Sequence, residues 1–227
     1  NVNKKINKGN SIFTFLKIAY NESTFHKIEE YLFNKYIKTI VDQIENKIIK
    51  LDKILNFENK YKKIALNGIT RLNSADKIRL ENCSSIDESK AYEFILLRYI
   101  DNILCYCDSK DNDKLVHNYY TLLKLCEASI MYLNKYVIQL CSYVINNIEP
   151  FVQKVTIIKN AVSIIETNKN LLKYRDMELY EHQKKIFTIC KQNDPKLVLY
   201  IAPTGTGKTL TPIGLSEESR IIFLCAA

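Results

Sequence analysis

A stretch near the C-terminus has the residue types and the spacing that binding of a nucleoside triphosphate requires. It is A-P-T-G-T-G-K-T at residues 202–209. Gly205 and Gly207 allow backbone angles that a Cβ atom would forbid, so that amide N–H groups can approach a phosphate closely. Lys208 offers a positive charge to the β- and γ-phosphates, and the hydroxyl of Thr209 suits Mg²⁺. We therefore expect ATP and Mg²⁺ to bind here.

The flanking residues are of the kind that positions such a loop. Residues 197–201 are all apolar or aromatic, which predicts a short buried strand, and Pro203 and the glycines then interrupt it. A helix that begins near Lys208 would direct the partial positive charge of its N-terminus at the phosphates. The alternative is a tight strand-to-helix connection without a ligand, but this leaves the position of the Lys-Thr pair unexplained.

The loop resembles motif I of the superfamily two helicases and translocases, the DEAD/DEAH-like enzymes. The general pattern of such a loop is G-x-x-x-x-G-K-[ST]. This chain has Ala202 at the first position, where the leading glycine of that family is often replaced by alanine. Tyr180-Glu181-His182-Gln183 is similar to the Y-x-x-Q element that precedes motif I in many of these enzymes. This similarity implies that the amide of Gln183 hydrogen-bonds the adenine edge, and an ordinary helical glutamine is the alternative.

The resemblance also implies a set of site residues and a fold. Lys208 would be the catalytic residue and Thr209 the magnesium ligand, and the nucleotide-binding residues would be Gln183, Thr204, Gly205, Thr206, Gly207, Lys208 and Thr209. The implied fold is an α/β RecA-like domain, whose second strand, in residues 220–227, leads toward motif Ia. Its implied activity is that of a nucleic-acid-dependent ATPase or helicase, with DNA or RNA as partner.

Complete members of that family contain parts that this chain lacks. These are the acidic motif II and a second domain with an arginine finger, and Asn1 stands where a natural start would have methionine. We therefore expect an N-terminal fragment of a larger enzyme that binds nucleotide weakly at most and has no ATPase activity by itself. The bias toward Asn, Ile, Lys and Tyr, and the long segment before the loop, are similar to helicases of giant DNA viruses, which implies a viral source.

The part before the loop has a different composition. Only Gly9, Gly68 and Pro150 interrupt residues 1–173. Apolar residues recur there three and four positions apart, which predicts an antiparallel bundle with helices at residues 11–20, 24–56, 58–65, 86–107, 115–148 and 151–173. We expect residues 86–107, apolar on most sides, to be central. The sequence thus predicts a helical accessory domain at residues 1–173 and the incomplete beginning of a RecA-like ATP-binding domain at residues 174–227.

Charge and cysteine usage limit the partners and the compartment. The net charge is +8, and residues 1–63 carry thirteen Lys against seven Asp or Glu, which suits either a nucleic-acid face or a solvated helix surface. The seven cysteines include no C-x-x-C pair, so they do not indicate zinc and fit a reducing intracellular compartment, cytoplasm or nucleus. No apolar run reaches the ~18 residues of a membrane-spanning helix, so we expect no membrane partner.

Two other functions fit the same residues. One is a P-loop ATPase that acts on protein partners, but the A-P-T start and the Y-x-x-Q element disfavour it. The other is a helical module that binds nucleic acid or a protein, with a non-functional loop attached. The histidines, among them His182, have no ligand-spaced neighbour and no partnered nucleophile, so we expect no catalytic role for them.

Overall fold

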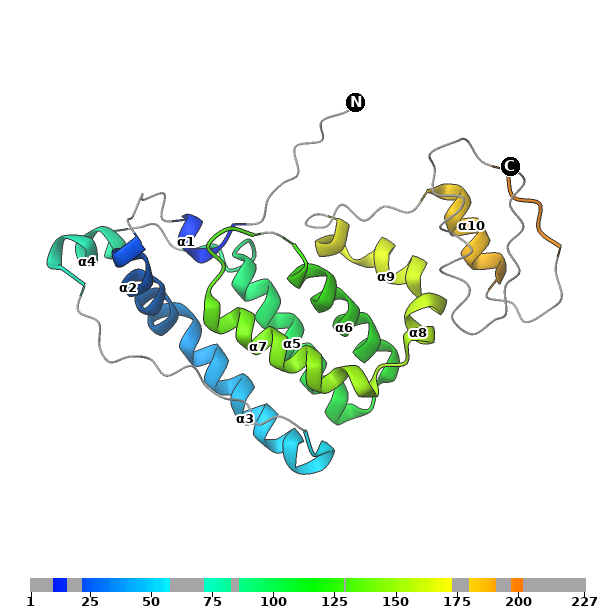
Figure 1. Cartoon of the computed structure of the whole chain (residues 1–227), viewed down its shortest axis with the longest axis horizontal. Coiled ribbons are helices and arrows are strands. Elements are labelled where there is room, and N and C mark those ends of the chain that lie inside the picture. The colour runs from blue at the N-terminus through cyan, green and yellow to red at the C-terminus, as the bar shows by residue number, and fades with distance from the viewer. Residues whose placement is uncertain are drawn as a thin grey trace.

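Apolar stripes that Gly and Pro do not interrupt fold into helices that pack on one another. The computed structural model describes residues 10–15, 22–57, 72–82, 86–128, 130–172, 180–190 and 197–201, and within these ranges it contains helices and no strand. The helices before residue 173 form a bundle around one contiguous hydrophobic core (Figure 1). The prediction of a mainly α-helical region is confirmed.

The first long helical element has three parts: α2 (Glu22–Leu32), the π-helix η1 (Phe33–Ile37) and α3 (Lys38–Leu55). The sequence predicts one regular helix here, but Leu32 and Ile37 are both buried although they lie five residues apart. A turn with the wider π spacing brings both side chains to the core face. After it, the core positions follow the predicted spacing at Val41, Ile44, Ile48 and Leu51.

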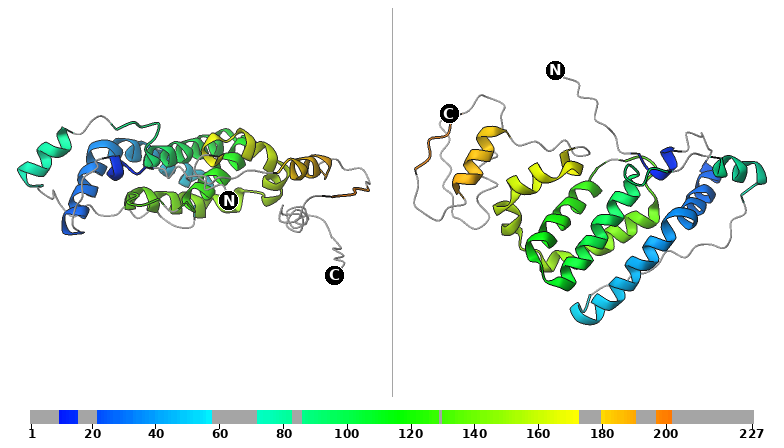
Figure 2. Two further views of the ribbon diagram at one scale, coloured as in Figure 1. Left: turned by 90° about the horizontal axis from the view of Figure 1, so that it is seen from above. Right: turned by 180° about the vertical axis from the view of Figure 1, so that it is seen from behind.

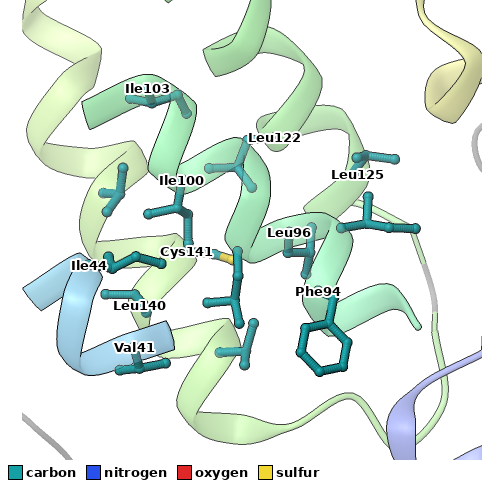
Figure 3. Packing of buried hydrophobic residues seen from close by; sticks show 14 of the residues in the cluster. Val41, Ile44, Phe94, Leu96, Ile100, Ile103, Leu122, Leu125, Leu140 and Cys141 are labelled. Atoms are coloured by element: carbon teal, nitrogen blue, oxygen red, sulfur yellow. The ribbon is translucent and has the colours of Figure 1, made fainter. Parts of the chain in front are cut away.

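The centre of the bundle is α5 (Tyr92–Ser109), which contacts α3, α6 (Asn112–Cys126) and α7 (Lys135–Ile148). Leu96, Ile100 and Ile103 on α5 are fully buried. Figure 3 shows core side chains from α3, α5, α6 and α7 gathered in one cluster. The predicted central position of this helix is confirmed. It begins six residues later than expected because Asp87 forms a turn, in which it accepts a hydrogen bond from the backbone N–H of Ser89 at 3.0 Å.

The prediction of a single helix over residues 115–148 is wrong. The structure has two helices there, because α6 ends at Cys126 and α7 begins at Lys135. Asn134 is the N-cap of α7, and its side chain accepts a hydrogen bond from the backbone N–H two residues further on at 3.1 Å. The apolar spacing continues through the break because the connection itself contributes side chains that pack against the core, Ala128, Ile130 and Leu133.

The prediction of one helix over residues 151–173 is wrong as well. The chain forms the 3-10 helix η2 (Glu149–Phe151), then α8 (Lys154–Lys159) and α9 (Ala161–Thr167). Asn160 separates the last two, with backbone angles of φ −104° and ψ 7°. Asparagine favours such breaks because its side chain competes for backbone hydrogen bonds. Pro150 lies in η2 and ends α7 as expected.

Two short helices lie beside α2. In α1 (Ile12–Phe15), Phe13 packs against Phe25 and Tyr132, with ring centroids 4.7 and 5.1 Å away. The remainder of the helix predicted at residues 11–20, and the one predicted at residues 58–65, lie outside the described residues. The other short helix is α4 (Ser74–Glu81), which Asn73 caps by accepting a hydrogen bond from the N–H of Asp76 at 2.9 Å.

The last described helix, α10 (Glu181–Cys190), lies beyond α8 and α9, away from α5 and α7 (Figures 1 and 2). An ion pair of 2.7 Å between Lys184 and Glu166 connects it to α9. Among the described residues, no helix combines the length and apolar character needed to cross a membrane. The RecA-like fold expected from residue 174 stays a prediction, because most of that segment lies outside the described residues.

Candidate functional site

The structure describes one of the residues that the sequence predicts for nucleotide binding, Gln183 on α10. The six others lie outside the described residues: Thr204, Gly205, Thr206, Gly207, Lys208 and Thr209. The predicted second strand at residues 220–227 lies outside them too. The roles of these residues stay predictions. What the structure places is the helix that carries Gln183 and the segment, residues 197–201, that leads to the loop.

Gln183 stabilises the start of its own helix. Its Oε1 accepts a hydrogen bond from the backbone N–H of Tyr180 at 3.1 Å, and its own N–H donates to the Tyr180 carbonyl oxygen at 2.9 Å. The hydrogen bond to Oε1 is the half of a capping box that the side chain three residues after the N-cap supplies, and it satisfies a donor that a helix start leaves without a partner. The side chain is half-buried. Binding of an adenine edge by this amide would therefore replace the hydrogen bond to Tyr180.

His182 joins the start of α10 to the segment that leads to the loop. Its Nδ1 lies 2.6 Å from the hydroxyl of Tyr200, and the two rings are in contact, with centroids 5.5 Å apart. The ring of Tyr180 stacks on the same imidazole at 5.3 Å, with 14° between the planes. The Nε2 of His182 is buried and has no hydrogen-bond partner among the described residues. Sequence analysis missed this contact because the two residues lie eighteen positions apart and no local pattern pairs them.

The buried strand predicted at residues 197–201 is not present. These residues form no strand in the structure, and the exposed fractions of Leu197, Leu199 and Ile201 are 102%, 86% and 81%. A strand of a parallel sheet is buried only when neighbouring strands pair with its edges and helices cover both faces. No such neighbour lies among the described residues, so the apolar run alone does not produce the strand.

A groove of about 430 Å³ lies between α9 and α10. Glu166 and Val162 line it from α9, and α10 contributes Glu181, Lys184, Lys185, Thr188 and Ile189. The ammonium group of Lys184 lies 2.7 Å from Glu166 and 3.9 Å from Glu181. Because two lysines and two glutamates balance each other, the groove does not favour a phosphate over a cation.

A second polar cluster surrounds Asn168, which is buried at the end of α9. Its side-chain N–H₂ donates to the hydroxyl of Thr121 at 2.7 Å and lies 3.4 Å from Nε2 of His117. Its Oδ1 accepts from the hydroxyl of Tyr99 at 3.3 Å and from the N–H groups of the two residues at 170 and 171. Burial lowers the pKa of His117, which favours the neutral imidazole. The side chain of Asn168 thus holds the chain after α9 against α5 and α6, which is a structural role.

Two buried carboxylates, Glu93 on α5 and Glu29 on α2, have backbone hydrogen-bond partners. Glu93 accepts hydrogen bonds from the N–H groups of Ile12 at 2.8 Å and Asn134 at 3.3 Å. Burial raises its pKa to about 7, and the charge of Glu29 adds to this against the backbone hydrogen bonds. Glu29 accepts from the N–H of Lys135 at 2.8 Å. Because backbone donors hold both oxygens of Glu93 and Oε1 of Glu29, the pair fastens the N-terminal segment and the start of α7, which is a structural role.

Thr209, the residue predicted to bind the metal, lies outside the described residues. Within the ranges that the structure describes, no group of three or more His, Cys, Asp and Glu side chains could hold a metal ion. The best-defined feature of the candidate site is therefore the contact of α10 with residues 197–201.

Comparisons with known proteins add no family assignment. No protein-family model, no curated protein and no solved structure matches this chain.

Proposed function

We propose that this chain supplies the ATP-binding loop of a nucleic-acid-dependent ATPase of the helicase or translocase class. The donor set at residues 202–209 fits ATP and Mg²⁺. Gly205 and Gly207 permit close approach of backbone N–H groups to phosphate oxygens, Lys208 neutralises phosphate charge, and the Thr209 hydroxyl provides a metal ligand. Bound ATP would supply a phosphoanhydride bond whose hydrolysis can drive movement along a nucleic acid.

One observation in the described structure supports this proposal most: the hydrogen bond between His182 and Tyr200. Adenine and triphosphate belong to one molecule, so a helix that contacts the adenine has to be held close to the phosphate-binding loop. Tyr200 lies two residues before Ala202, the first residue of the loop, and His182 lies next to Gln183. The contact therefore holds the proposed adenine-binding residue against the segment that enters the loop.

The proposal assigns Gln183 a second hydrogen-bonding arrangement. Its amide offers one acceptor and two donors, which suits the adenine edge. In the described structure its Oε1 accepts from the N–H of Tyr180. On nucleotide binding we expect that oxygen to accept from the adenine amino group instead, while water or the nucleotide satisfies the exposed backbone donor.

Equilibrium binding of a fluorescent ATP analogue to the full chain in the presence of Mg²⁺ tests the proposal. We expect weak but measurable binding, and we expect Lys208→Ala to reduce the affinity about 10-fold or more, because a charge-assisted contact to phosphate is lost. Lys185→Ala is the matched control, since Lys185 is an exposed lysine on α10. Equal affinities of the wild type, Lys208→Ala and Lys185→Ala would contradict the proposal.

Two further measurements examine the expected partner and the expected activity. Binding of single-stranded DNA and RNA should weaken steeply as salt rises, because phosphate contacts release counterions. Binding that does not depend on salt would argue against a phosphate-contacting surface. We also expect no ATP hydrolysis by this chain alone, and hydrolysis that Lys208→Ala abolishes would overturn that expectation.

A further inference from the structure

The structure separates the charged residues of residues 24–57 by exposure, although lysines and acids are interspersed in the sequence. The exposed charged side chains in this range are all lysines: Lys27, Lys35, Lys38, Lys50 and Lys53. Every Asp and Glu in the same range is buried or half-buried: Glu29, Glu30, Asp42, Glu45 and Asp52. The exposed charge of α2, η1 and α3 is therefore of one sign.

The acids of this segment take part in the fold. Glu29 accepts a hydrogen bond from the first backbone N–H of α7 at 2.8 Å, and Asp52 accepts one from a backbone N–H just after α3 at 3.1 Å. The other three acids also have interaction partners. Between the described residues, no ion pair joins any of these carboxylates to Lys38, Lys50 or Lys53.

Four of the exposed lysines lie along one helical element at the edge of the bundle. Lys35 is in η1, and Lys38, Lys50 and Lys53 are in α3; we call these four residues the lysine face. Exposed positions on α3 recur four and three apart, at 39, 43, 46, 50 and 53, so they share one side of the helix. Its 18 residues span about 27 Å, enough to follow several consecutive phosphates.

The residues around the lysines suit a strand of nucleic acid. Gln43 and Asn46 are exposed on the same side of α3, and their amides can donate to phosphate and sugar oxygens. The ammonium group of Lys35 lies 5.6 Å from the ring centroid of Tyr31 and 5.1 Å from that of Tyr36. Aromatic rings beside a cation are the combination on which an unpaired base stacks while its phosphate is neutralised.

An anionic membrane is the alternative partner for exposed lysines. A helix that binds a membrane surface places a continuous apolar side in the lipid. The apolar stripe of α3 is buried in the core instead, and the large apolar side chains that α3 exposes are Ile49 and Ile54. Lysine and amide side chains separate these two from a continuous apolar surface, so the face is complementary to phosphates more than to lipid tails.

We propose that the lysine face binds a single strand of DNA or RNA through its phosphates, with Tyr31 and Tyr36 in contact with unpaired bases. The choice of nucleic acid as the partner rests on the proposed function. Figures 1 and 2 show α3 on the side of the bundle away from α10. The face therefore anchors the bundle to the strand independently of nucleotide binding.

Acetylation of lysines in the wild-type full chain, with and without an oligothymidylate of about 20 nucleotides, tests this proposal without any substitution. We expect the bound strand to slow acetylation of the lysine face several-fold, as measured by mass spectrometry of peptides. Lys110 and Lys169, which are exposed at the ends of α5 and α9, should react equally in both samples. An oligouridylate of the same length shows whether RNA binds as DNA does. A lysine face that reacts equally with and without either oligonucleotide would overturn the proposal.

A variant measures how much the face contributes to affinity. Combining Lys38→Gln, Lys50→Gln and Lys53→Gln should weaken binding of the fluorescein-labelled oligothymidylate about 10-fold or more in an anisotropy titration. The slope of log affinity against log salt concentration should fall by about 2, because three phosphate contacts are lost at about 0.7 each. These side chains are exposed, so the substitutions leave the core unchanged.

The matched control removes the same charge elsewhere. It combines Lys110→Gln, Lys169→Gln and Lys185→Gln, three exposed lysines outside α2, η1 and α3. We expect this variant to keep the affinity and the salt dependence of the wild type. Equal losses in the two triple variants would mean that affinity follows net charge, and the proposal would be wrong.

Binding of the ATP analogue separates this inference from the proposed function. The triple variant of the lysine face should bind the analogue as the wild type does. If it also keeps the wild-type affinity for the oligonucleotide, the lysine face is not the binding surface, and Lys208→Ala still decides the proposed function. A wild type that binds phosphatidylserine vesicles but no oligonucleotide would make the face a membrane-binding surface and would overturn the proposal.

Discussion

Two apolar stretches of this chain differ in the burial of their side chains. On α5, Leu96, Ile100 and Ile103 have exposed fractions of 0%. At residues 197–201, which are just as apolar, Leu197 and Leu199 have exposed fractions of 102% and 86%. Composition therefore does not separate the two stretches. What separates them is packing: α5 contacts α3, α6 and α7, whereas no strand among the described residues pairs with residues 197–201.

The difference shows that a helix and a strand depend on distant residues to different degrees. A helix satisfies its backbone hydrogen bonds internally, so α5 forms from local sequence and then packs its apolar sides on α3, α6 and α7. A strand of a parallel sheet satisfies its backbone only by pairing with another segment that is distant in sequence. Residues 197–201 have a side-chain contact with a segment distant in sequence, that of Tyr200 with His182.

Shortening one buried and one exposed apolar side chain tests this comparison with the largest expected effect. Ile100→Ala should lower the free energy of unfolding by about 2–5 kcal/mol, because it removes buried methyl groups and leaves a cavity in the core. Leu199→Ala should change it by less than about 0.5 kcal/mol, because that side chain is already exposed. Urea denaturation measures both. Similar losses for the two variants would mean that residues 197–201 are buried in solution.

The pH dependence of stability gives a second test, at a buried polar group of α5. Glu93 fastens the N-terminal segment to the bundle. Its folded pKa of about 7 lies above the ordinary value of 4.5, so the folded state holds this proton more tightly than the unfolded state. Its contribution to stability is thus fully present below about pH 4.5 and is lost as the pH rises through 7. The loss is on the order of 3 kcal/mol. Unfolding free energies of wild type and Glu93→Gln between pH 5 and pH 8 measure it.

Comparing wild type with Glu93→Gln isolates the contribution of Glu93 to the pH dependence of stability from those of the other titrating groups. Glu93→Gln should be less stable than wild type at pH 5, because one carboxyl oxygen is replaced by an N–H₂ group that faces a backbone N–H. The difference in unfolding free energy between the two proteins should become smaller toward pH 8, where the wild-type carboxylate carries its buried charge. A difference that stays constant between pH 5 and pH 8 would show that Glu93 does not titrate in this range.

The smallest expected effect is on the contact between α10 and residues 197–201. Tyr200→Phe removes the hydroxyl that lies 2.6 Å from His182 but keeps the ring. Loss of about 1 kcal/mol there should increase hydrogen exchange about fivefold at the start of α10, where the N–H groups of Gln183 and Lys184 donate to the carbonyl of Tyr180, and leave exchange in α5 unchanged. Tyr180→Phe is the matched control, since the stacking of its ring on His182 does not need the hydroxyl. Equal exchange in the two variants would argue against the contact.

The sequence predicted the fold well where local spacing determines structure. The core positions of α3, from Val41 to Leu51, follow the repeat that the sequence contains, and the central place of α5 follows from its apolar circumference. The breaks at Asn134 and Asn160 were missed because the apolar spacing continues across both of them. The π-helix was missed because a spacing of five, from Leu32 to Ile37, conflicts with the regular repeat only when both side chains are known to be buried.

The candidate site was predictable to a smaller extent. Residues 202–209 suggest a phosphate-binding loop by spacing alone, and a helical position of Gln183 was expected. The role of His182 was not predictable, because it depends on a contact with Tyr200 across the connection between α10 and residues 197–201. The hydrogen bond of Gln183 to Tyr180 could have been suspected, since a Gln three residues after a helix N-cap is a capping-box position.

The central claim is that the start of α10 and the loop at residues 202–209 form one nucleotide site. Hydrogen exchange of the full chain with and without a nonhydrolysable ATP analogue and Mg²⁺ tests it most directly. We predict slower exchange in two peptides at once, one that covers residues 180–184 and one that covers residues 202–210, with no change in α5. Protection that is confined to the bundle, or slower exchange in one of the two peptides without the other, would contradict the claim.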